Sequence, residues 1–291
     1  MFNLMTFVTL FRLLRIKQYY KNLLIFLPLI FISQLFNPLA FFRVILGFIV
    51  LCLVSSSYYI LNDVIDRKKD INHPEKKNRP IASRKVNLFT GILFSLILLA
   101  IGLIISLFLD YVFFITVFSL FLLTIMYSFY FKNILFLDII FISINFVLRP
   151  LSGVFIIFPN QVIRISPWLI LVPFFLALFL ATAKRRSNLI FLGTEQKYNL
   201  VLNQYDQKTT SFLFSTSTTL LIFNYSLFTF FSDFPLLLIT IPVVLYAIFY
   251  FYKQVEEGSI IGRDLFFAIK NKNLLLSLLV WLILTFLIIY F

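Results

Sequence analysis

The sequence predicts an all-α fold, a polytopic bundle of about nine transmembrane helices. Hydrophobic residues make up 61% of the 291 residues and charged residues only 13%, whereas soluble domains contain about 45–50% and about 25% of these classes. The apolar residues form long unbroken runs, which excludes a transmembrane β-barrel because barrel strands alternate apolar and polar residues. The chain must therefore place these apolar side chains in a lipid bilayer. Its single cysteine, Cys52, excludes an intrachain disulfide.

Each predicted span is an apolar run close to the roughly 20 residues that a helix needs to cross the bilayer core. The runs cover residues 22–38, 40–61, 88–108, 110–131, 134–157, 166–183, 211–231, 234–252 and 274–291. The first run is short and ends at Asn37-Pro38, and only Asp110 separates the third run from the fourth. No internal repeat, linker or soluble segment interrupts the series, so we expect residues 1–291 to form a single integral-membrane domain.

The basic residues predict how the spans are oriented. The net charge is +13, and 22 of the 25 Lys and Arg residues precede the first span or lie in alternate loops. Those loops cover residues 62–87, 132–133, 184–210 and 253–273, and the exceptions are Arg43, Arg149 and Arg164. Because cytoplasmic loops carry the Lys and Arg excess, we expect a plasma (inner) membrane protein whose amino terminus and active site face the cytoplasm. In so apolar a chain this excess indicates topology and phosphorylated substrates rather than nucleic acid.

Oxygen-bearing side chains cluster where the second span ends. Asp63, Asp66 and Asp70 occupy one arc of roughly 60° if the helix continues, with Asn62 at its edge. Three carboxylates on one stripe repel each other unless a cation lies between them. Oxygen ligands without a His or Cys partner favour a hard cation, Mg²⁺ before Ca²⁺. The alternative is a solvated loop in which these acids pair with neighbouring Lys and Arg residues.

Basic residues follow this stripe directly, among them Lys77 and Arg79. A metal held by acids next to Lys and Arg suits a diphosphate leaving group, because both neutralise the charge that develops as the bond breaks. His73, the one histidine of the chain, precedes a proline in this loop. We therefore expect His73 to form a structural turn rather than to act as a general base.

The segment as a whole carries a long pattern, Asn62-Asp63-x-x-Asp66-x-x-x-Asp70-x-x-His73-Pro74-x-Lys76-x-x-Arg79-Pro80-Ile81-x-Ser83. This pattern resembles the first signature of the UbiA-type intramembrane prenyltransferase superfamily. The resemblance implies a nine-helix bundle, with a cytoplasmic cap over a cavity open to lipid, and Mg²⁺-dependent loss of pyrophosphate. It also implies that Asp63, Asp66 and Asp70 are catalytic residues that hold the metal.

Three further stretches carry patterns of their own. They are Arg15-Ile16-Lys17-Gln18-Tyr19-Tyr20-Lys21-Asn22, Tyr127-Ser128 through Lys132 and Asp138 to Phe146-Val147-Leu148-Arg149, and Phe179-Leu180 to Lys184-Arg185-Arg186. They resemble the decaprenyl-phosphate phosphoribosyltransferase branch, which moves phosphoribose from phosphoribosyl diphosphate onto a polyprenyl phosphate. Ile16 stands where that branch has Pro, Tyr19 where it has Trp, and Asn188 where an acid is expected. The second Asp-x-x-x-Asp motif of the aromatic prenyltransferases is absent from residues 184–210, which agrees better with a phosphoribosyl donor held by Lys and Arg.

The resemblance assigns substrate binding to polar residues of the spans and loops. These are Lys21, Asn22, Asn62, Lys77, Arg79, Tyr127, Lys132, Asp138, Arg149, Lys184 and Arg185. Most of the Lys and Arg residues among them would otherwise be topology anchors. Asp138 needs a partner or a metal, and Lys132 and Lys184 are the candidate partners. Arg149 lies well inside a span, where a cation is costly, so we expect it to face the bundle interior near Asn145 and Ser152.

The sequence therefore predicts a transferase with Mg²⁺ as cofactor. It would move 5-phosphoribose from phosphoribosyl diphosphate to a polyprenyl (decaprenyl-type) phosphate in the lipid bilayer and release pyrophosphate. One alternative is a UbiA-type prenyltransferase that moves an isoprenoid from its diphosphate to a small aromatic acceptor with the same metal site. A second alternative is a lipid or ion transporter, which only Arg149 supports because the other charges gather on one face.

Overall fold

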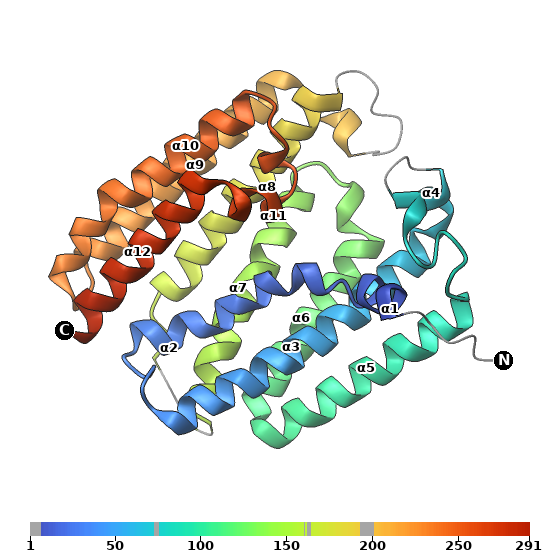
Figure 1. Ribbon diagram of the computed structural model, residues 1–291, viewed down its shortest axis with the longest axis horizontal. Helices are drawn as coiled ribbons and strands as arrows, with labels where there is room; N and C mark the ends of the chain where they lie inside the picture. The colour runs from blue at the N-terminus through green and yellow to red at the C-terminus, as the bar shows by residue number, and fades with distance from the viewer. Residues whose placement is uncertain (1–6, 73–75, 160, 162–163, 193–200) are drawn as a thin grey trace. The chain divides into compact units, whose positions relative to one another are not determined.

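The computed structural model describes residues 7–72, 76–159, 161, 164–192 and 201–291. Over these residues the chain forms α-helices and 3-10 helices and contains no strand, which confirms the predicted all-α fold (Figure 1). The chain divides into two compact units, and the division passes through α2 and α7, so each of these helices contributes to both units. The first unit comprises Met1–Leu29, Gln34–Tyr130 and Leu148–Ile163, and the second comprises Ile30–Ser33, Phe131–Val147 and Arg164–Phe291.

The first unit is built around one long helix, α3 (Pro38–Ile65), which packs against η1, α5 and α6 (Figure 1). Its other elements are α1 (Phe7–Leu14), η1 (Ile16–Phe26), α2 (Leu27–Phe31), α4 (Arg67–Ile71), η2 (Lys76–Asn78), α5 (Leu88–Leu109) and α6 (Tyr111–Phe129). Large apolar side chains from these helices, among them Val54, Phe113 and Leu120, are almost completely buried and form the core of the unit.

The second unit is a helical bundle in which α8 packs against α9, and α10 against α12. Its elements are η3 (Phe131–Asn133), the first part of α7 (Leu137–Ile157), α8 (Trp168–Leu192), η4 (Leu202–Gln204), α9 (Gln207–Phe230), η5 (Pro235–Thr240), α10 (Ile241–Glu256), η6 (Ile260–Gly262), α11 (Leu265–Lys270) and α12 (Lys272–Tyr290). Aromatic side chains fill its core: the ring centroid of Phe179 lies 5.4 Å from that of Phe214 and 5.3 Å from that of Phe251.

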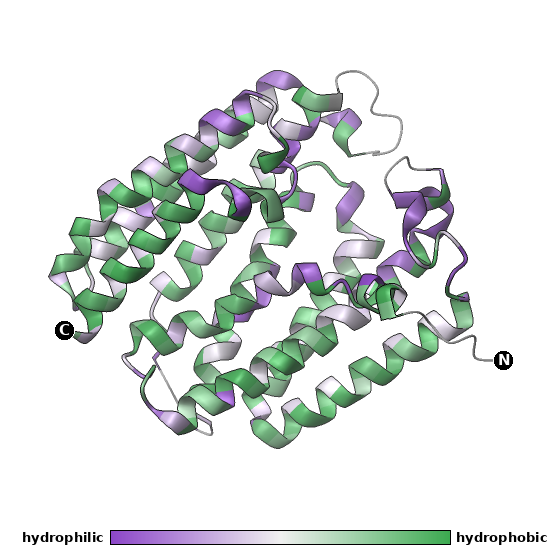
Figure 2. Cartoon of the chain, viewed as in Figure 1, coloured by the Kyte–Doolittle hydropathy of each residue, from purple (hydrophilic) through white to green (hydrophobic). Residues whose placement is uncertain are grey.

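Seven helices in the described part of the chain are long and apolar enough to cross a membrane: α3, α5, α6, α7, α8, α10 with the preceding η5, and α12. Figure 2 shows α5 and α12 as apolar over most of their length, whereas α4 is hydrophilic. Two of the nine predicted spans differ. The first, at 22–38, is not one long helix but η1 followed by the five-residue α2. The span at 211–231 is the 24-residue α9, which is rich in Ser and Thr and therefore less apolar.

Side-chain caps explain where several helices begin. The Asp110 Oδ1 atom accepts a hydrogen bond of 2.7 Å from the backbone N–H of Phe113, so Asp110 ends α5 and starts α6. The long apolar run on either side of it is thereby divided into two spans. Asn37 caps α3 through bonds from Leu39 and Ala40, and Pro38 occupies the first helical position.

The 11-residue 3-10 helix η1 packs against α3 through side chains spaced three residues apart. Tyr19 Oη and Ser56 Oγ form a hydrogen bond of 2.7 Å, and Asn22 Nδ2 donates to Ser55 Oγ at 3.2 Å. A 3-10 helix has three residues per turn, so side chains at this spacing lie on one face. Ile25 lies three residues further on, and its carbonyl oxygen is so close to Gly153 that a Cβ atom on Gly153 would overlap it.

Candidate functional site

The predicted acidic stripe lies across the junction of α3 and α4. The α3 helix ends at Ile65, and Asp66 joins it to α4. Helical hydrogen bonding continues through the junction, because Asp66 N donates to Asn62 O at 2.9 Å and Asp70 N donates to Asp66 O at 2.8 Å. The side chains of Asp63 and Asp70 are buried, with exposed fractions of 1% and 3%, so they do not belong to a solvated loop.

Two arginines converge on this pair of carboxylates. Arg79 Nη1 donates to Asp63 Oδ1 at 3.0 Å and to Asp70 Oδ2 at 2.7 Å. Arg15 Nη2 also donates to Asp63 Oδ1, and the Arg15 guanidinium lies 5.0 Å from the ring centroid of Tyr59. The structure therefore brings Asp63, Asp70 and Arg79 together, in the acid–base pairing that the alternative expected, and it adds Arg15.

The donor set suits a hard divalent cation. Asp63 Oδ2 is buried and has no hydrogen-bond partner among the described residues. Mg²⁺ is commonly held by one or two carboxylates, with waters and substrate phosphates completing its shell, and Asp63 and Asp70 offer such a pair. No group of three His, Cys, Asp or Glu side chains in the described part of the chain is close enough to hold a metal. The three-aspartate ligand set, with the half-buried Asp66, stays a prediction.

A third arginine of the same unit is buried between η1, α3 and α7. Arg149 is 3% exposed. Its Nε donates to Asn22 Oδ1 at 3.1 Å, and its Nη2 donates to Tyr58 Oη at 3.2 Å. Tyr58 Oη in turn donates to Ser55 Oγ at 3.1 Å. Arg149 faces the bundle interior, as predicted, and its side chain bonds to residues of two other helices. Ser152, which was expected nearby, donates from its Oγ to the Arg149 carbonyl oxygen at 2.6 Å.

The second unit contains its own buried carboxylate, Asp138, near the start of α7. Arg185 Nε donates to Asp138 Oδ2 at 2.7 Å, and Tyr205 Oη donates to Asp138 Oδ1 at 2.7 Å. Burial and the hydrogen bond to Asp138 raise the pKa of the Tyr205 phenol, so it stays protonated and can donate. The ion pair of Asp138 is thus with Arg185, whereas the sequence suggested Lys132 or Lys184.

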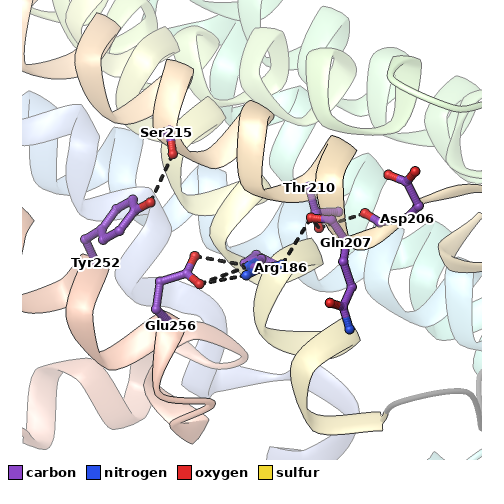
Figure 3. Close-up of polar contacts among 7 residues, drawn as sticks. All are labelled: Arg186, Asp206, Gln207, Thr210, Ser215, Tyr252 and Glu256. Atoms are coloured by element: carbon purple, nitrogen blue, oxygen red, sulfur yellow. Dashed lines mark hydrogen bonds and ion pairs between the residues drawn. The ribbon is translucent and has the colours of Figure 1, made fainter.

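The neighbouring Arg186 joins three helices of the second unit (Figure 3). Its guanidinium donates to both carboxylate oxygens of Glu256 on α10, with the shortest bond at 2.7 Å. Its Nη1 donates to the carbonyl oxygen of Gln207, at the start of α9, at 3.1 Å. A guanidinium held in this bidentate way has a structural role, as a connection between α8, α9 and α10.

The other predicted substrate-binding residues are placed as follows: Asn62, Lys21, Tyr127 and Lys132 are half-buried, and Lys77 and Lys184 are exposed. Their contacts with substrate stay predictions. His73 lies outside the described residues. The sequence missed Arg15, Tyr58 and Tyr205 as site residues. Arg15 stands in a pattern that was recognised, and Tyr58 lies five residues before Asp63.

Comparison with known proteins identifies a family and several relatives. A family model described as the UbiA prenyltransferase family matches residues 23–267. A decaprenyl-phosphate phosphoribosyltransferase from Corynebacterium glutamicum is 31% identical over 223 residues, which cover 75% of this chain and 66% of that protein. One from Mycolicibacterium smegmatis is 27% identical over 258 residues, covering 82% and 78%. The uncharacterized protein y4nM of Sinorhizobium fredii is 35% identical over 176 residues, which cover 59% of this chain and only 33% of that protein.

Solved structures share the fold. A UbiA homolog from Archaeoglobus fulgidus, bound to GPP and Mg²⁺, has a TM-score of 0.68 at 17% identity, and the match covers 97% of this chain and 96% of that chain. A digeranylgeranylglyceryl phosphate synthase has a TM-score of 0.67 at 19% identity, with 96% and 98% covered. The seven apolar helices and the family match together make this chain an integral membrane protein.

Proposed function

Because the chain belongs to the UbiA prenyltransferase family and is therefore a transferase, we propose that it transfers 5-phosphoribose from phosphoribosyl diphosphate to a polyprenyl phosphate. Two decaprenyl-phosphate phosphoribosyltransferases, at 31% and 27% identity, support this choice of substrates. The distribution of Lys and Arg supports an active site on the cytoplasmic side of the plasma membrane.

The observation that carries the proposal is the buried cation Arg149, which is separate from Arg15 and Arg79. A prenyl diphosphate with a neutral aromatic acceptor brings a single phosphorylated group, whereas phosphoribosyl diphosphate with a polyprenyl phosphate brings several. The first unit offers two cationic positions along α3, with Arg15 and Arg79 at Asp63 and with Arg149 at Tyr58. Five residues separate Tyr58 from Asp63, or about 7.5 Å along the helix axis at 1.5 Å per residue. The first unit therefore offers separate cationic positions for two phosphorylated groups at different levels of α3.

In the proposed reaction an oxygen atom of the polyprenyl phosphate attacks C1 of the ribose while the bond from C1 to the diphosphate oxygen breaks. Pyrophosphate leaves with the bonding electron pair, and C1 gains oxocarbenium character during the exchange. Because the attacking phosphate oxygen is already anionic, no general base has to remove a proton.

The residues of the first unit have separate tasks in this scheme. Arg149 and Asn22 would hold and orient the acceptor phosphate, and their neutral hydrogen-bond partners on α3 would fix their positions. Arg15 and Arg79 would accept charge from the departing pyrophosphate. Mg²⁺ held by Asp63, Asp66 and Asp70 would supply further neutralisation of the diphosphate when bound.

Transfer of a prenyl group is the second candidate, because the Archaeoglobus fulgidus homolog, which shares the fold, binds GPP and Mg²⁺. Purified protein in nanodiscs separates the two. One assay would contain phosphoribosyl diphosphate, polyprenyl phosphate and Mg²⁺, and the other a prenyl diphosphate with an aromatic acceptor. We expect pyrophosphate release in the first assay. Release only in the second would contradict the proposal.

The role of Arg149 has its own test in the same assay. Arg149→Gln should raise the KM for polyprenyl phosphate about 10- to 100-fold, since a charge-assisted phosphate contact contributes about 1.5–3 kcal/mol. The KM for phosphoribosyl diphosphate should change less. Arg164→Gln, which removes the same charge from an exposed side chain, is the matched control. Equal loss for both substrates would assign Arg149 to the structure of the protein rather than to the acceptor.

A further inference from the structure

We propose that Arg79 holds the position of the divalent cation in the ligand-free protein and passes to the diphosphate when substrate arrives. The proposal rests on the proposed function only in placing a metal and a diphosphate at Asp63 and Asp70. It predicts that metal ion and diphosphate bind cooperatively, because each needs Arg79 to move.

The geometry of one nitrogen atom carries this inference. Arg79 Nη1 lies 3.0 Å from Asp63 Oδ1 and 2.7 Å from Asp70 Oδ2. A single positively charged donor therefore bridges two carboxylates that come from α3 and α4. A divalent cation held by both aspartates would use Asp63 Oδ2, which has no donor among the described residues, together with Asp70 Oδ2, which Arg79 occupies. Its bonds to oxygen are only about 2.0–2.6 Å long, so the cation and the Arg79 guanidinium compete for Asp70.

The side chain of Arg79 is free to leave, whereas its backbone is fixed. The side chain is 25% exposed. The Arg79 N–H donates to the carbonyl oxygen of Lys76 at 3.0 Å, and the Arg79 carbonyl oxygen accepts bonds from Ser83 N at 2.9 Å and from Ser83 Oγ at 2.8 Å. Only rotation about side-chain bonds is needed to move the guanidinium out of the pair of carboxylates.

A diphosphate gives the displaced guanidinium a new partner. Arginine binds phosphate oxygens in a bidentate manner, so it can exchange two carboxylate bonds for two phosphate bonds. The diphosphate also donates oxygen ligands to the metal ion. Arg15 stays on Asp63 Oδ1 in either case and prevents the buried carboxylate from losing all its positive neighbours. Metal ion alone should therefore bind weakly, and metal ion with diphosphate tightly.

Titration with Mn²⁺, followed by electron paramagnetic resonance, tests this coupling without turnover. Wild-type protein should bind Mn²⁺ more tightly when pyrophosphate is present, by about 5- to 150-fold, the usual range of coupling between sites. In Arg79→Gln the competing charge is gone, so Mn²⁺ alone should bind at least about fivefold more tightly than to wild type. The enhancement by pyrophosphate should shrink in the same variant. Arg84→Gln, an exposed position in the same loop, should behave as wild type.

Two results would overturn the proposal. One is Arg79→Gln with an affinity for Mn²⁺ alone that is equal to or weaker than that of wild type. The other is Arg79→Lys with an affinity for Mn²⁺ alone as high as that of Arg79→Gln, since lysine keeps the charge. If the glutamine variant does not fold, Arg79→Lys is compared with wild type, and a clearly higher affinity of the lysine variant for Mn²⁺ alone would overturn the proposal. Because Mn²⁺ and pyrophosphate are common to both candidate reactions, the proposal can stand even if phosphoribosyl diphosphate is not the donor.

Discussion

Each of the two compact units contains a buried aspartate held by arginine, and the two aspartates differ in how completely their oxygen atoms are bonded. In the second unit Asp138 receives Arg185 on Oδ2 and Tyr205 on Oδ1, both at 2.7 Å. In the first unit Arg15 and Arg79 both bond Oδ1 of Asp63, and Oδ2 has no hydrogen-bond partner among the described residues.

The difference is the one expected between a structural ion pair and the proposed ligand site. A buried carboxylate oxygen without a donor costs free energy, and a bound cation would remove that cost. Both oxygen atoms of Asp138 have donors, and Asp138 connects α7, α8 and the segment before α9. Asp63 has one oxygen atom without a donor among the described residues, and the side chain of Arg79 beside it is 25% exposed, so Arg79 can exchange partners.

Asp63→Asn should have the largest effect on activity. We expect pyrophosphate release to fall at least about 100-fold, because an electrostatic group at the reacting centre commonly contributes that much. The midpoint of thermal unfolding should change little, because Arg15 and Arg79 reach solvent and Arg79 keeps Asp70. Asp233→Asn, an exposed carboxylate, is the control. A large drop in the midpoint with activity retained would reverse the assignment.

Asp138→Asn should act in the opposite sense, on stability first. Removing one partner of a buried pair costs about 3–5 kcal/mol, because Arg185 keeps its charge with a side chain only 12% exposed. Thermal unfolding in detergent measures this loss. The double variant Asp138→Asn/Arg185→Gln should be less destabilised than the sum of the single variants. Additive losses would mean that the two side chains do not depend on each other.

Tyr205→Phe should have the smallest effect of the three. It removes the donor from Asp138 Oδ1 and leaves a buried acceptor unsatisfied, at a cost of about 1–3 kcal/mol. Tyr246→Phe, on a tyrosine that is 52% exposed, should leave the midpoint of unfolding unchanged. If Tyr205→Phe matched that control, the bond to Asp138 would contribute nothing to the stability of the second unit.

The sequence predicted those features of the molecule that depend on residues close together in the chain. The apolar runs located the long helices, since burial in lipid selects for uninterrupted hydrophobic residues. Asp63, Asp70 and Arg79 lie within one short segment, so helical spacing and charge were enough to group these residues as one candidate site. The boundary at Asp110, which the runs left uncertain, required the side-chain cap to be seen.

Contacts between residues far apart in the chain could not be predicted from the sequence. The bond from Arg149 to Asn22 joins residues 127 positions apart, and that from Tyr205 to Asp138 joins residues 67 apart. Helical periodicity identifies neighbours within one helix, such as Ser152 for Arg149, but it contains no information about which other helix approaches. The same holds for η1, because 3-10 helices longer than four residues are uncommon and tertiary packing must stabilise this one.

The length of η1 fixes the orientation of Asn22. Since successive residues of a 3-10 helix are rotated by about 120°, one residue inserted between Tyr19 and Asn22 would turn Asn22 away from Arg149 while Tyr19 still met Ser56. A helix with 3.6 residues per turn would also move Ile25 off the shared face. The segment should therefore tolerate substitution more readily than a change in length, and an insertion or deletion there would disconnect Arg149 from its amide partner without changing Asp63, Asp66 or Asp70.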